Sequence, residues 1–338
     1  MTISFPATAT ILLTCVLVTG DLGLPVFNMR VRAQLFDDVL FAVVYQNSII
    51  LISRKISPNE TSYGTGFLAS YASGIMPSGV GEHFKSKSVY LITNKHVLPA
   101  ENRNESIKIR IGKREKDKQT PVWLEIPITG DNGTYLPGIQ INKNGADIAV
   151  LDVTKQLQAL NDEFLYKFGT LPVPVLITNK RLAEQGIDMG EDIYVLGFPD
   201  SVHDPSTFSP IIRRGIIASD INQGFKFDGY RKSEYGFPDK LNGFLIDAQI
   251  FPGSSGSLVI LKPRKSLHPE LGVKDKPYPW LLGIVSDSIP VNDTALKNKQ
   301  RMGLGVVYSS QSILETIGQF PYEADSIKLL CEECTVKQ

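Results

Sequence analysis

The sequence predicts an all-β fold, two antiparallel barrels followed by a C-terminal helix. Short runs of apolar and β-branched residues recur along the chain with little helical periodicity, and Gly, Pro, Asn and Asp cluster between them. One segment near the C-terminus has a clear helical period instead. About a dozen strands without alternating helices favour antiparallel sheets over a parallel sheet of repeated β-α-β units.

The elements follow from these patterns in chain order. The helix is predicted over residues 310–319, where serines supply an N-cap and Ile313, Leu314 and Ile317 share one face. A shorter helix is predicted within residues 155–168. The break between the barrels is expected near 171–175, because two prolines there fix the backbone and remove two hydrogen-bond donors. The predicted strands are 39–45, 48–53, 65–70, 89–93, 107–111, 123–126, 148–153, 193–197, 211–219, 243–248, 257–261, 281–286 and 303–308.

Composition limits the classes of function. The 338 residues are 42% apolar, enough for one large domain or two small ones. Basic and acidic residues balance at 35 each, so no global positive field attracts nucleic acid, and we expect no nucleic-acid partner.

The three cysteines lie outside the long middle of the chain. Cys15 is near the N-terminus, and Cys331 and Cys334 are near the C-terminus, so the core must depend on packing alone. The Cys331–Cys334 spacing is that of a metal-binding pair, but a zinc site needs about four ligands and the chain has no second pair. We therefore predict a flexible tail or a local redox pair over residues 321–338, with no metal and no cofactor.

The N-terminal segment poses a targeting question. Residues 7–20 are apolar, too short to span a bilayer comfortably, and match the length of a signal-peptide core. No Lys or Arg precedes them and no clear cleavage site follows, although residues 12–15 resemble a bacterial lipoprotein box. We predict a signal or anchor over 1–30 and an exported protein (periplasmic, secreted or membrane-anchored), with membrane contact only through that anchor. The alternative is a cytoplasmic protein with an extra strand or an over-long start.

Residues 253–257, Gly-Ser-Ser-Gly-Ser, follow directly on the apolar run 244–252. Glycines on both sides of a serine let the backbone turn sharply and let N–H groups converge beside the Ser255 hydroxyl. Such a loop can expose a nucleophile, but Gly/Ser clusters also form plain turns.

His96 is the best placed of the four histidines. It follows the apolar run 89–93, where a buried strand would hold its ring still. The other three histidines (His83, His203 and His268) lie in polar loops. A histidine at a strand end can equally be a structural group.

Asp147 stands at the start of an apolar strand, 148–153. A carboxylate there loses hydration unless it gains a partner, and an imidazole that donates its Nδ1–H is a suitable one. The alternative is a capping Asp that accepts nearby backbone N–H groups.

The order of His96, Asp147 and Ser255 along the chain indicates a common function. A nucleophile, a base that takes its proton and a carboxylate that orients the base form a Ser–His–Asp mechanism. Their spacing suits a His96 and an Asp147 from one barrel that meet Ser255 from the next. An α/β-hydrolase is disfavoured, because Ser257 occupies the last glycine position of its motif and its triad order is Ser, Asp, His.

Four segments carry a family resemblance. Residues 65–68 (Thr-Gly-Phe-Leu), 92–97 (Ile-Thr-Asn-Lys-His-Val), 147–151 (Asp-Ile-Ala-Val-Leu) and 253–257 together resemble the trypsin-like, chymotrypsin-fold serine proteases. The bacterial branch that includes the HtrA/Deg proteases is the nearest match, without a PDZ domain after residue 320. The resemblance covers residues 37–320 and implies two six-stranded antiparallel barrels.

The resemblance also implies roles. Ser255 is the expected nucleophile, His96 the general base and then acid, and Asp147 its orienting partner. The N–H groups of Gly253 and Ser255 are the expected oxyanion hole. Three further residues are expected to bind substrate: Ser286 and Ser288 on the strand that pairs with it, and Gln249 at the base of the specificity pocket.

Two departures from the family pattern bear on the expected activation and cleavage preference. Ser254 replaces the aspartate that pairs with a freshly cut N-terminus in digestive enzymes, so that activation route is not expected. Gln249 replaces an acidic pocket base, so a preference for Lys or Arg is not expected.

The function predicted from the sequence is therefore a serine endopeptidase that cleaves protein or peptide substrates through an acyl-enzyme. A non-catalytic peptide- or protein-binding module on the same fold is the alternative, because a fold does not fix a function.

Overall fold

A computed structural model describes residues 45–338 except for a set of short gaps. The predicted segment 1–30 and the predicted strand 39–45, up to residue 44, lie outside the described residues. The gaps are 71–87, 100–101, 103, 116–117, 161–165, 168, 205–206, 230–231, 234–235, 263–264, 269–271, 276–279, 291–300, 333 and 335–338.

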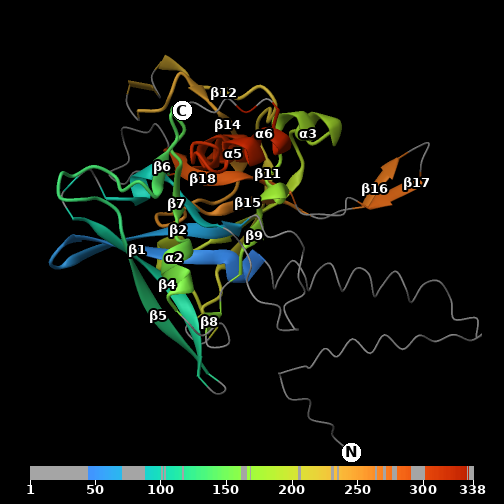
Figure 1. The fold of residues 1–338 in the computed structure, drawn as a ribbon. Coiled ribbons are helices and arrows are strands. Elements are labelled where there is room, and N and C mark those ends of the chain that lie inside the picture. Colours follow the sequence, from blue (N-terminus) through green and yellow to red (C-terminus); the bar gives the residue numbers. More distant parts are fainter. Residues whose placement is uncertain are drawn as a thin grey trace, which may run out of the picture. The chain divides into compact units, whose positions relative to one another are not determined.

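The N-terminal half of the described chain forms a nine-stranded sheet in the order β5-β4-β1-β2-β3-β7-β6, with β8 on β4 and β9 on β2 (Figure 1). Its pairs are antiparallel except for β2 with β9, which is parallel. The strands are β1 (Ile49–Ser57), β2 (Glu60–Ser70), β3 (Val89–Thr93), β4 (Ser106–Glu115), β5 (Lys118–Pro127), β6 (Ile139–Ile141), β7 (Ala149–Asp152), β8 (Tyr166–Lys167) and β9 (Leu171–Pro172).

The C-terminal half forms a closed six-stranded barrel in the order β10-β11-β14-β19-β18-β15. Two small hairpins, β12–β13 and β16–β17, are added to it. The barrel strands are β10 (Asp192–Gly197), β11 (Ile211–Ile217), β14 (Gly243–Asp247), β15 (Leu258–Leu261), β18 (Leu281–Pro290) and β19 (Arg301–Ser309). The hairpin strands are β12 (Phe225–Lys226), β13 (Lys240–Leu241), β16 (Lys265–His268) and β17 (Gly272–Asp275).

Helices are few and short in the part of the chain that the structure describes. The helix predicted at 310–319 is confirmed as α5 (Ser310–Ile317), and the Ser309 hydroxyl caps it by accepting the Ser312 N–H. Its predicted apolar face is fully buried. Further helices among the described residues are α2 (Thr154–Gln158), α3 (Asn179–Glu184), α6 (Ala324–Leu330) and the 3-10 turns η1 (Lys95–Val97), η2 (Val173–Val175) and η3 (Pro199–Ser201).

The predicted all-β class with a C-terminal helix is confirmed. Twelve predicted strands, from 48–53 to 303–308, overlap observed ones. The N-terminal sheet has nine strands rather than six, because short pieces such as β8 and β9 extend it. Strands of two or three residues, such as β6, β8 and β9, carry no usable periodicity, which is why they were not predicted. The expected break at 171–175 begins with β9 and continues as η2, despite its prolines.

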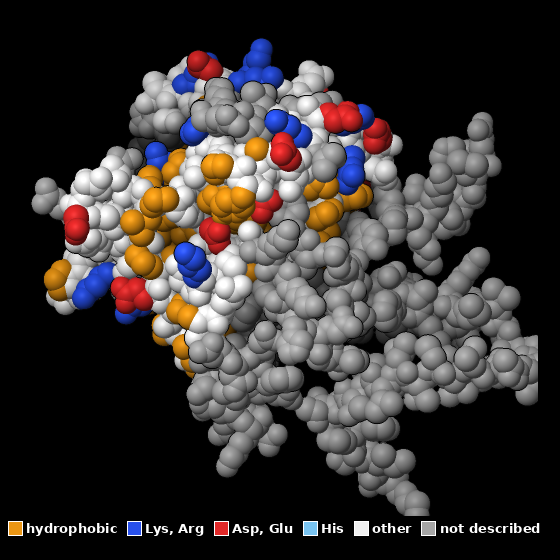
Figure 2. Space-filling view, viewed as in Figure 1, with side chains coloured by type: hydrophobic (Ala, Val, Ile, Leu, Met, Phe, Trp, Pro, Cys, Tyr) orange, Lys and Arg blue, Asp and Glu red, His pale blue; other side chains and the backbone are white. Residues whose placement is uncertain are grey.

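The core joins the two halves. One buried cluster contains Phe67 and Ile92 of the N-terminal sheet together with Leu258 and Ile284 of the barrel. Two further clusters fill the N-terminal sheet and the barrel separately. On the face in Figure 2, acidic and basic side chains are interspersed among hydrophobic ones, as the balanced composition leads one to expect.

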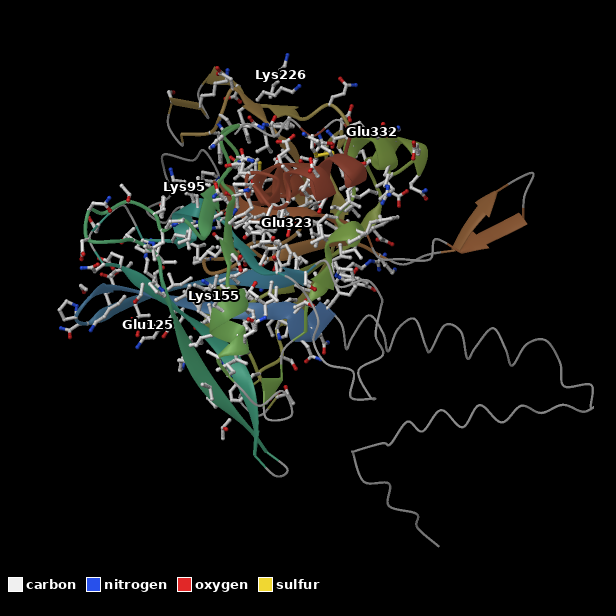
Figure 3. All side chains as sticks on the ribbon, viewed as in Figure 1. Lys95, Glu125, Lys155, Lys226, Glu323 and Glu332 are labelled. Atoms are coloured by element: carbon white, nitrogen blue, oxygen red, sulfur yellow. A yellow bond between two sulfur atoms is a disulfide. The ribbon has the colours of Figure 1, made fainter. Side chains whose placement is uncertain are left out.

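The prediction of a tail over 321–338 is wrong for its described part. Helix α6 packs Ile327, at 0% exposure, into the core shared by both halves. The Tyr90 hydroxyl donates to the Glu323 carboxylate (2.6 Å), and Figure 3 shows Glu323 in the middle of the fold. The Tyr322 hydroxyl donates to Asp152 (2.6 Å), so two side-chain hydrogen bonds fix the segment to the N-terminal sheet.

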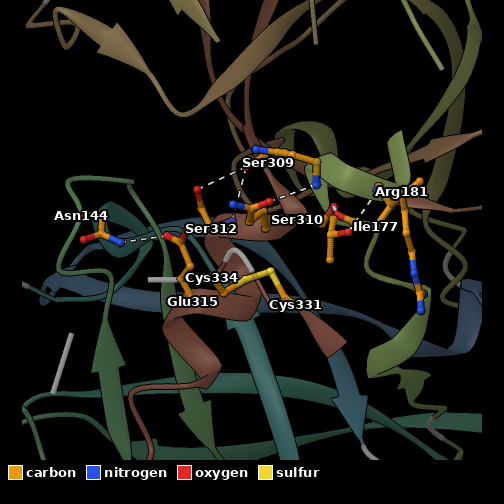
Figure 4. Close-up of a disulfide and its surroundings, with 12 residues drawn as sticks. Asn144, Ile177, Arg181, Ser309, Ser310, Ser312, Glu315, Cys331 and Cys334 are labelled. Carbon is orange, nitrogen blue, oxygen red and sulfur yellow. Dashed lines mark hydrogen bonds between the residues drawn. A yellow bond between two sulfur atoms is a disulfide. The ribbon is translucent and has the colours of Figure 1, made fainter. Parts of the chain in front are cut away.

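The two C-terminal cysteines form a disulfide, Cys331–Cys334, beside α5 (Figure 4). Cys331 is 3% exposed and ends α6. No cluster of metal-ligating side chains occurs among the described residues. Within the same part of the chain, no helix is long and apolar enough to cross a membrane.

Replacement of Ile327 by Ala tests whether α6 belongs to the fold. The variant leaves a cavity in the shared core, so we expect its free energy of unfolding to fall by about 2–5 kcal/mol in urea denaturation. The control is Asp325→Ala on the exposed side of the same helix, which should change it by less than about 0.5 kcal/mol. Equal stability of the two variants would show that the helix is dispensable.

Candidate active site

Antiparallel pairing brings His96 and Asp147 together. Thr93 at the end of β3 pairs with Ala149 at the start of β7. His96 follows β3 by one 3-10 turn and Asp147 precedes β7, so the two side chains emerge at the same edge of the sheet.

The Asp147 carboxylate holds His96 at two points. Its Oδ2 lies 2.5 Å from His96 Nδ1, and its Oδ1 accepts the His96 backbone N–H at 3.1 Å. The Asn94 amide donates to the Asp147 carbonyl (2.7 Å), which fixes the backbone of the acid as well. With its proton on Nδ1, the imidazole carries a free lone pair on Nε2, the atom that a general base uses.

Opposing effects act on the pKa of His96. Burial lowers it, but the hydrogen bond to Asp147, the Asp147 charge and the Asp287 charge together outweigh burial, so the pKa is raised above its ordinary value of 6.5. A raised folded-state pKa means that protonation stabilises the fold. That contribution is fully present below pH 6.5 and is lost as the pH rises through the raised pKa.

The serine loop depends on two glycines in the left-handed region, Gly253 (φ 81°) and Gly256 (φ 86°). A Cβ at Gly256 would lie 1.8 Å from the Thr65 carbonyl oxygen, so no other residue fits. Thr65 of β2 holds the loop: its N–H donates to the Ser255 carbonyl (2.8 Å) and its hydroxyl to the Gly253 carbonyl (3.0 Å).

The carbonyls of Pro252 and Ser254 determine how two N–H groups of the serine loop are oriented. The Pro252 carbonyl accepts the Asp200 N–H (2.6 Å), and the Ser254 carbonyl accepts the Ser257 N–H (2.9 Å). A trans peptide directs its N–H opposite to its C=O. The N–H groups of Gly253 and Ser255 therefore face the other side, and in the described part of the chain neither has a hydrogen-bond partner.

Ser286 connects the serine to the histidine–aspartate pair. The Ser255 hydroxyl donates to the Ser286 carbonyl (3.0 Å), and the Ser286 hydroxyl donates to Asp147 Oδ2 (2.7 Å). No direct hydrogen bond joins His96 and Ser255 among the residues that the structure describes. Such contacts are often long without substrate, and rotation about χ1 would redirect the Ser255 hydroxyl.

The other predicted binding residues differ in setting. Ser288 of β18 is 2% exposed, and its hydroxyl has no partner within the described ranges. It pairs with Gly305 of β19, where an added Cβ would lie 2.7 Å from Ile250. Gln249 is exposed, and its backbone carbonyl, which accepts from Arg213, is engaged rather than its amide.

Sequence reasoning assigned no role to three residues that hold this site: Thr65, Asn94 and Asp200. Thr65 and Asn94 fall inside the motifs that carry the resemblance, so their positions were a usable signal. Asp200 adopts the left-handed conformation (φ 49°), and nothing in its neighbourhood in the sequence announces this.

Comparison with known families agrees with the fold. The profile of the trypsin-like peptidase domain matches residues 64–264, more than half of the chain. The chain therefore belongs to the trypsin-like peptidase family. No curated protein matches it.

Several solved structures are similar to this chain. The HtrA-type protease AlgW with a tripeptide is 16% identical over 84% of this chain (TM-score 0.42), and this chain spans only 63% of its length. The active form of the Rv3671c protease from M. tuberculosis is 17% identical over 85% of each chain (TM-score 0.42). A serine endoprotease from Yersinia pestis is 14% identical over 85% of this chain and 67% of its own (TM-score 0.40).

The His96 pKa can be measured without any substrate. In an NMR titration of the imidazole Cε1–H signals, we expect His96 to titrate above 6.5. Asp147→Asn should lower its pKa, because the main charge that stabilises the imidazolium is removed. Asp287→Asn, which removes a weaker contribution, should lower it less. An unchanged His96 pKa in Asp147→Asn would contradict the pairing.

Proposed function

We propose that this chain is a serine endopeptidase in which Ser255 is the nucleophile, His96 the general base and acid, and Asp147 the residue that orients His96. One observation carries the proposal. The oriented His96–Asp147 pair is linked through Ser286 to a serine beside two N–H groups, those of Gly253 and Ser255, that are free within the described residues.

The proposed chemistry proceeds in two halves. Ser255 Oγ adds to the carbonyl carbon of the scissile peptide while its proton passes to His96 Nε2, and the carbonyl electrons move to oxygen. The tetrahedral intermediate collapses with loss of the amine, which takes the proton from His96. Water then gives a proton to His96 and attacks the acyl ester, and Ser255 recovers its proton as the acid leaves.

The N–H groups of Gly253 and Ser255 would stabilise the negative oxygen of both tetrahedral intermediates. Each such donor contributes about 2.7–4 kcal/mol to the transition state in related sites. Asp147 stabilises the imidazolium that forms at the same time and keeps the proton on Nδ1.

The proposed substrates are proteins or peptides. Ser286 and Ser288 on β18 would pair with the extended substrate backbone. The uncharged Gln249 and the buried, unpartnered Ser288 hydroxyl do not supply the negative charge that a Lys or Arg side chain needs. This chemistry uses only groups of the chain and water.

We also propose that the protein is exported. The apolar residues 7–20 have the length of a signal-peptide core, and the Cys331–Cys334 disulfide supports an oxidising compartment, since such bonds are rare in the cytosol. A cytoplasmic location remains the alternative, and the redox state of Cys331 in protein taken from cells distinguishes the two.

A fluorophosphonate probe separates a protease from a binding module. The probe should label the wild type and Ser106→Ala, a control at a partly buried serine of β4 whose hydroxyl donates to Glu125, because both retain an activated nucleophile. Ser255→Ala should not be labelled. Correctly folded wild type that resists labelling would favour the non-catalytic alternative.

The pH dependence of hydrolysis tests His96 as the base. Because only neutral imidazole accepts the Ser255 proton and the pKa of His96 is raised, kcat/KM should rise with pH through a midpoint above 6.5. The measurement is initial rates on a cleaved peptide from a library. A flat profile across this range would remove His96 from this role.

A further inference from the structure

The turn between β10 and β11 contacts both the N-terminal sheet and the serine loop. We infer that Arg110 of β4, acting through His203, is a positioning residue for the oxyanion hole. The contact holds residues 198–203, here called the η3 loop, in the conformation that fixes the Pro252–Gly253 peptide. The inference rests on the function proposed above for that hole.

The first step of the argument is the contact between the η3 loop and Gly253. The Asp200 N–H donates to the Pro252 carbonyl at 2.6 Å, and this bond sets which way the Gly253 N–H points. The contact is close, because a Cβ on Gly253 would lie 2.9 Å from both Asp200 N and the Phe198 carbonyl oxygen. Movement of the η3 loop would therefore free this peptide to rotate.

The second step is the conformation of the η3 loop. Asp200 (φ 49°) and Ser201 (φ 57°) are consecutive non-glycine residues in the left-handed region. L-residues disfavour this region, and Ser is not among the residues that tolerate it best. A conformation of this kind persists only where surrounding contacts hold it.

The third step is the contact that holds it. Arg110 Nη1 lies 2.9 Å from His203 Nε2, and His203 Nδ1 lies 2.6 Å from the Ser201 carbonyl oxygen. Because a guanidinium can only donate, His203 Nε2 must accept, and the neutral ring then donates its Nδ1–H to Ser201. Arg110 thus selects the tautomer that binds the left-handed turn.

Aromatic packing fixes the same contact. The Arg110 guanidinium lies 3.6 Å from the centre of the Phe208 ring. The His203 ring packs edge-on against Phe198 (6.3 Å) and lies 5.9 Å from Phe208. The rings of Phe198 and Phe208 therefore both restrict the position of the His203 ring.

The burial of Arg110 is unfavourable by itself. It is 8% exposed, its Nε and Nη2 atoms lack hydrogen-bond partners among the described residues, and no carboxylate there forms an ion pair with it. Burial without a carboxylate lowers its pKa to about 10. An apolar side chain of similar length would avoid this desolvation, so a purely structural role does not explain an arginine here.

The test compares Arg110→Met and His203→Phe with His203→Gln. The first removes the donor, and the second keeps the ring packing but removes the acceptor. His203→Gln retains both functions of the ring, because its amide oxygen can accept from Arg110 and its amide NH2 can donate to the Ser201 carbonyl. Arg214→Met, which breaks an exposed ion pair with Asp192, is the matched arginine control.

We expect Arg110→Met and His203→Phe to lower kcat on a peptide substrate by about tenfold to hundredfold with little change in KM. This decrease is smaller than the one expected from complete loss of an oxyanion-hole N–H donor. His203→Gln should recover most of kcat, and Arg214→Met should match the wild type. In the adduct of a ¹³C-labelled peptidyl chloromethyl ketone, the pKa of the hemiketal hydroxyl should rise in the two impaired variants only. A merely structural role would leave that pKa unchanged.

The inference is overturned if variants that fold as the wild type keep both kcat and the hemiketal pKa. If Arg110→Met does not fold, His203→Phe decides alone. If the wild type proves inactive, the proposed function fails, and the Gly253 amide NMR signal tests the contact independently. A shift of that signal in Arg110→Met and His203→Phe but not in His203→Gln supports the inference, and no shift overturns it.

Discussion

Thr65 is the residue on which the geometry of the site depends most directly. It is fully buried, its N–H binds the Ser255 carbonyl and its carbonyl accepts the Thr93 hydroxyl. Its own hydroxyl donates to the Gly253 carbonyl and accepts the Phe198 N–H (3.0 Å). Three of these four hydrogen bonds join one residue of the N-terminal sheet to the barrel, two of them to the serine loop and one to Phe198.

The residues of the candidate active site come from both halves of the fold, so their relative positions depend on the buried cluster that joins the two halves. His96 and Asp147 come from the N-terminal sheet, while Ser255, Ser286 and the N–H groups of the proposed oxyanion hole come from the barrel. Errors in their relative position would enter every step of the proposed chemistry, since misplacement of about 1 Å can cost a hundredfold in rate. The cluster that joins both halves, together with α6, resists such a displacement.

The sequence allowed prediction of those parts of the candidate site that lie at the ends of regular strands. The proximity of His96 and Asp147 could be predicted, because each borders an apolar run and antiparallel pairing of β3 with β7 places them together. It did not allow prediction of those parts that depend on irregular backbone. Nothing distinguishes His203 from His83 or His268 before the left-handed turn at Asp200 and Ser201 is known. The contact of Arg110 with His203 spans the two halves, and no local pattern encodes it.

The same limit applies to helix α6. Its seven residues are too few for a decisive helical period, and the cysteines that follow suggested an independent tail. Its position is instead determined by the contacts of Tyr322 with Asp152 and of Glu323 with Tyr90, partners that lie 170 and 233 residues away in the sequence. Burial of Glu323 at 6% exposure is tolerable because the Tyr90 hydroxyl satisfies it. The C-terminal segment therefore stabilises the sheet that carries His96 and Asp147. Its loss would displace these two residues through that sheet rather than by removal of a direct contact.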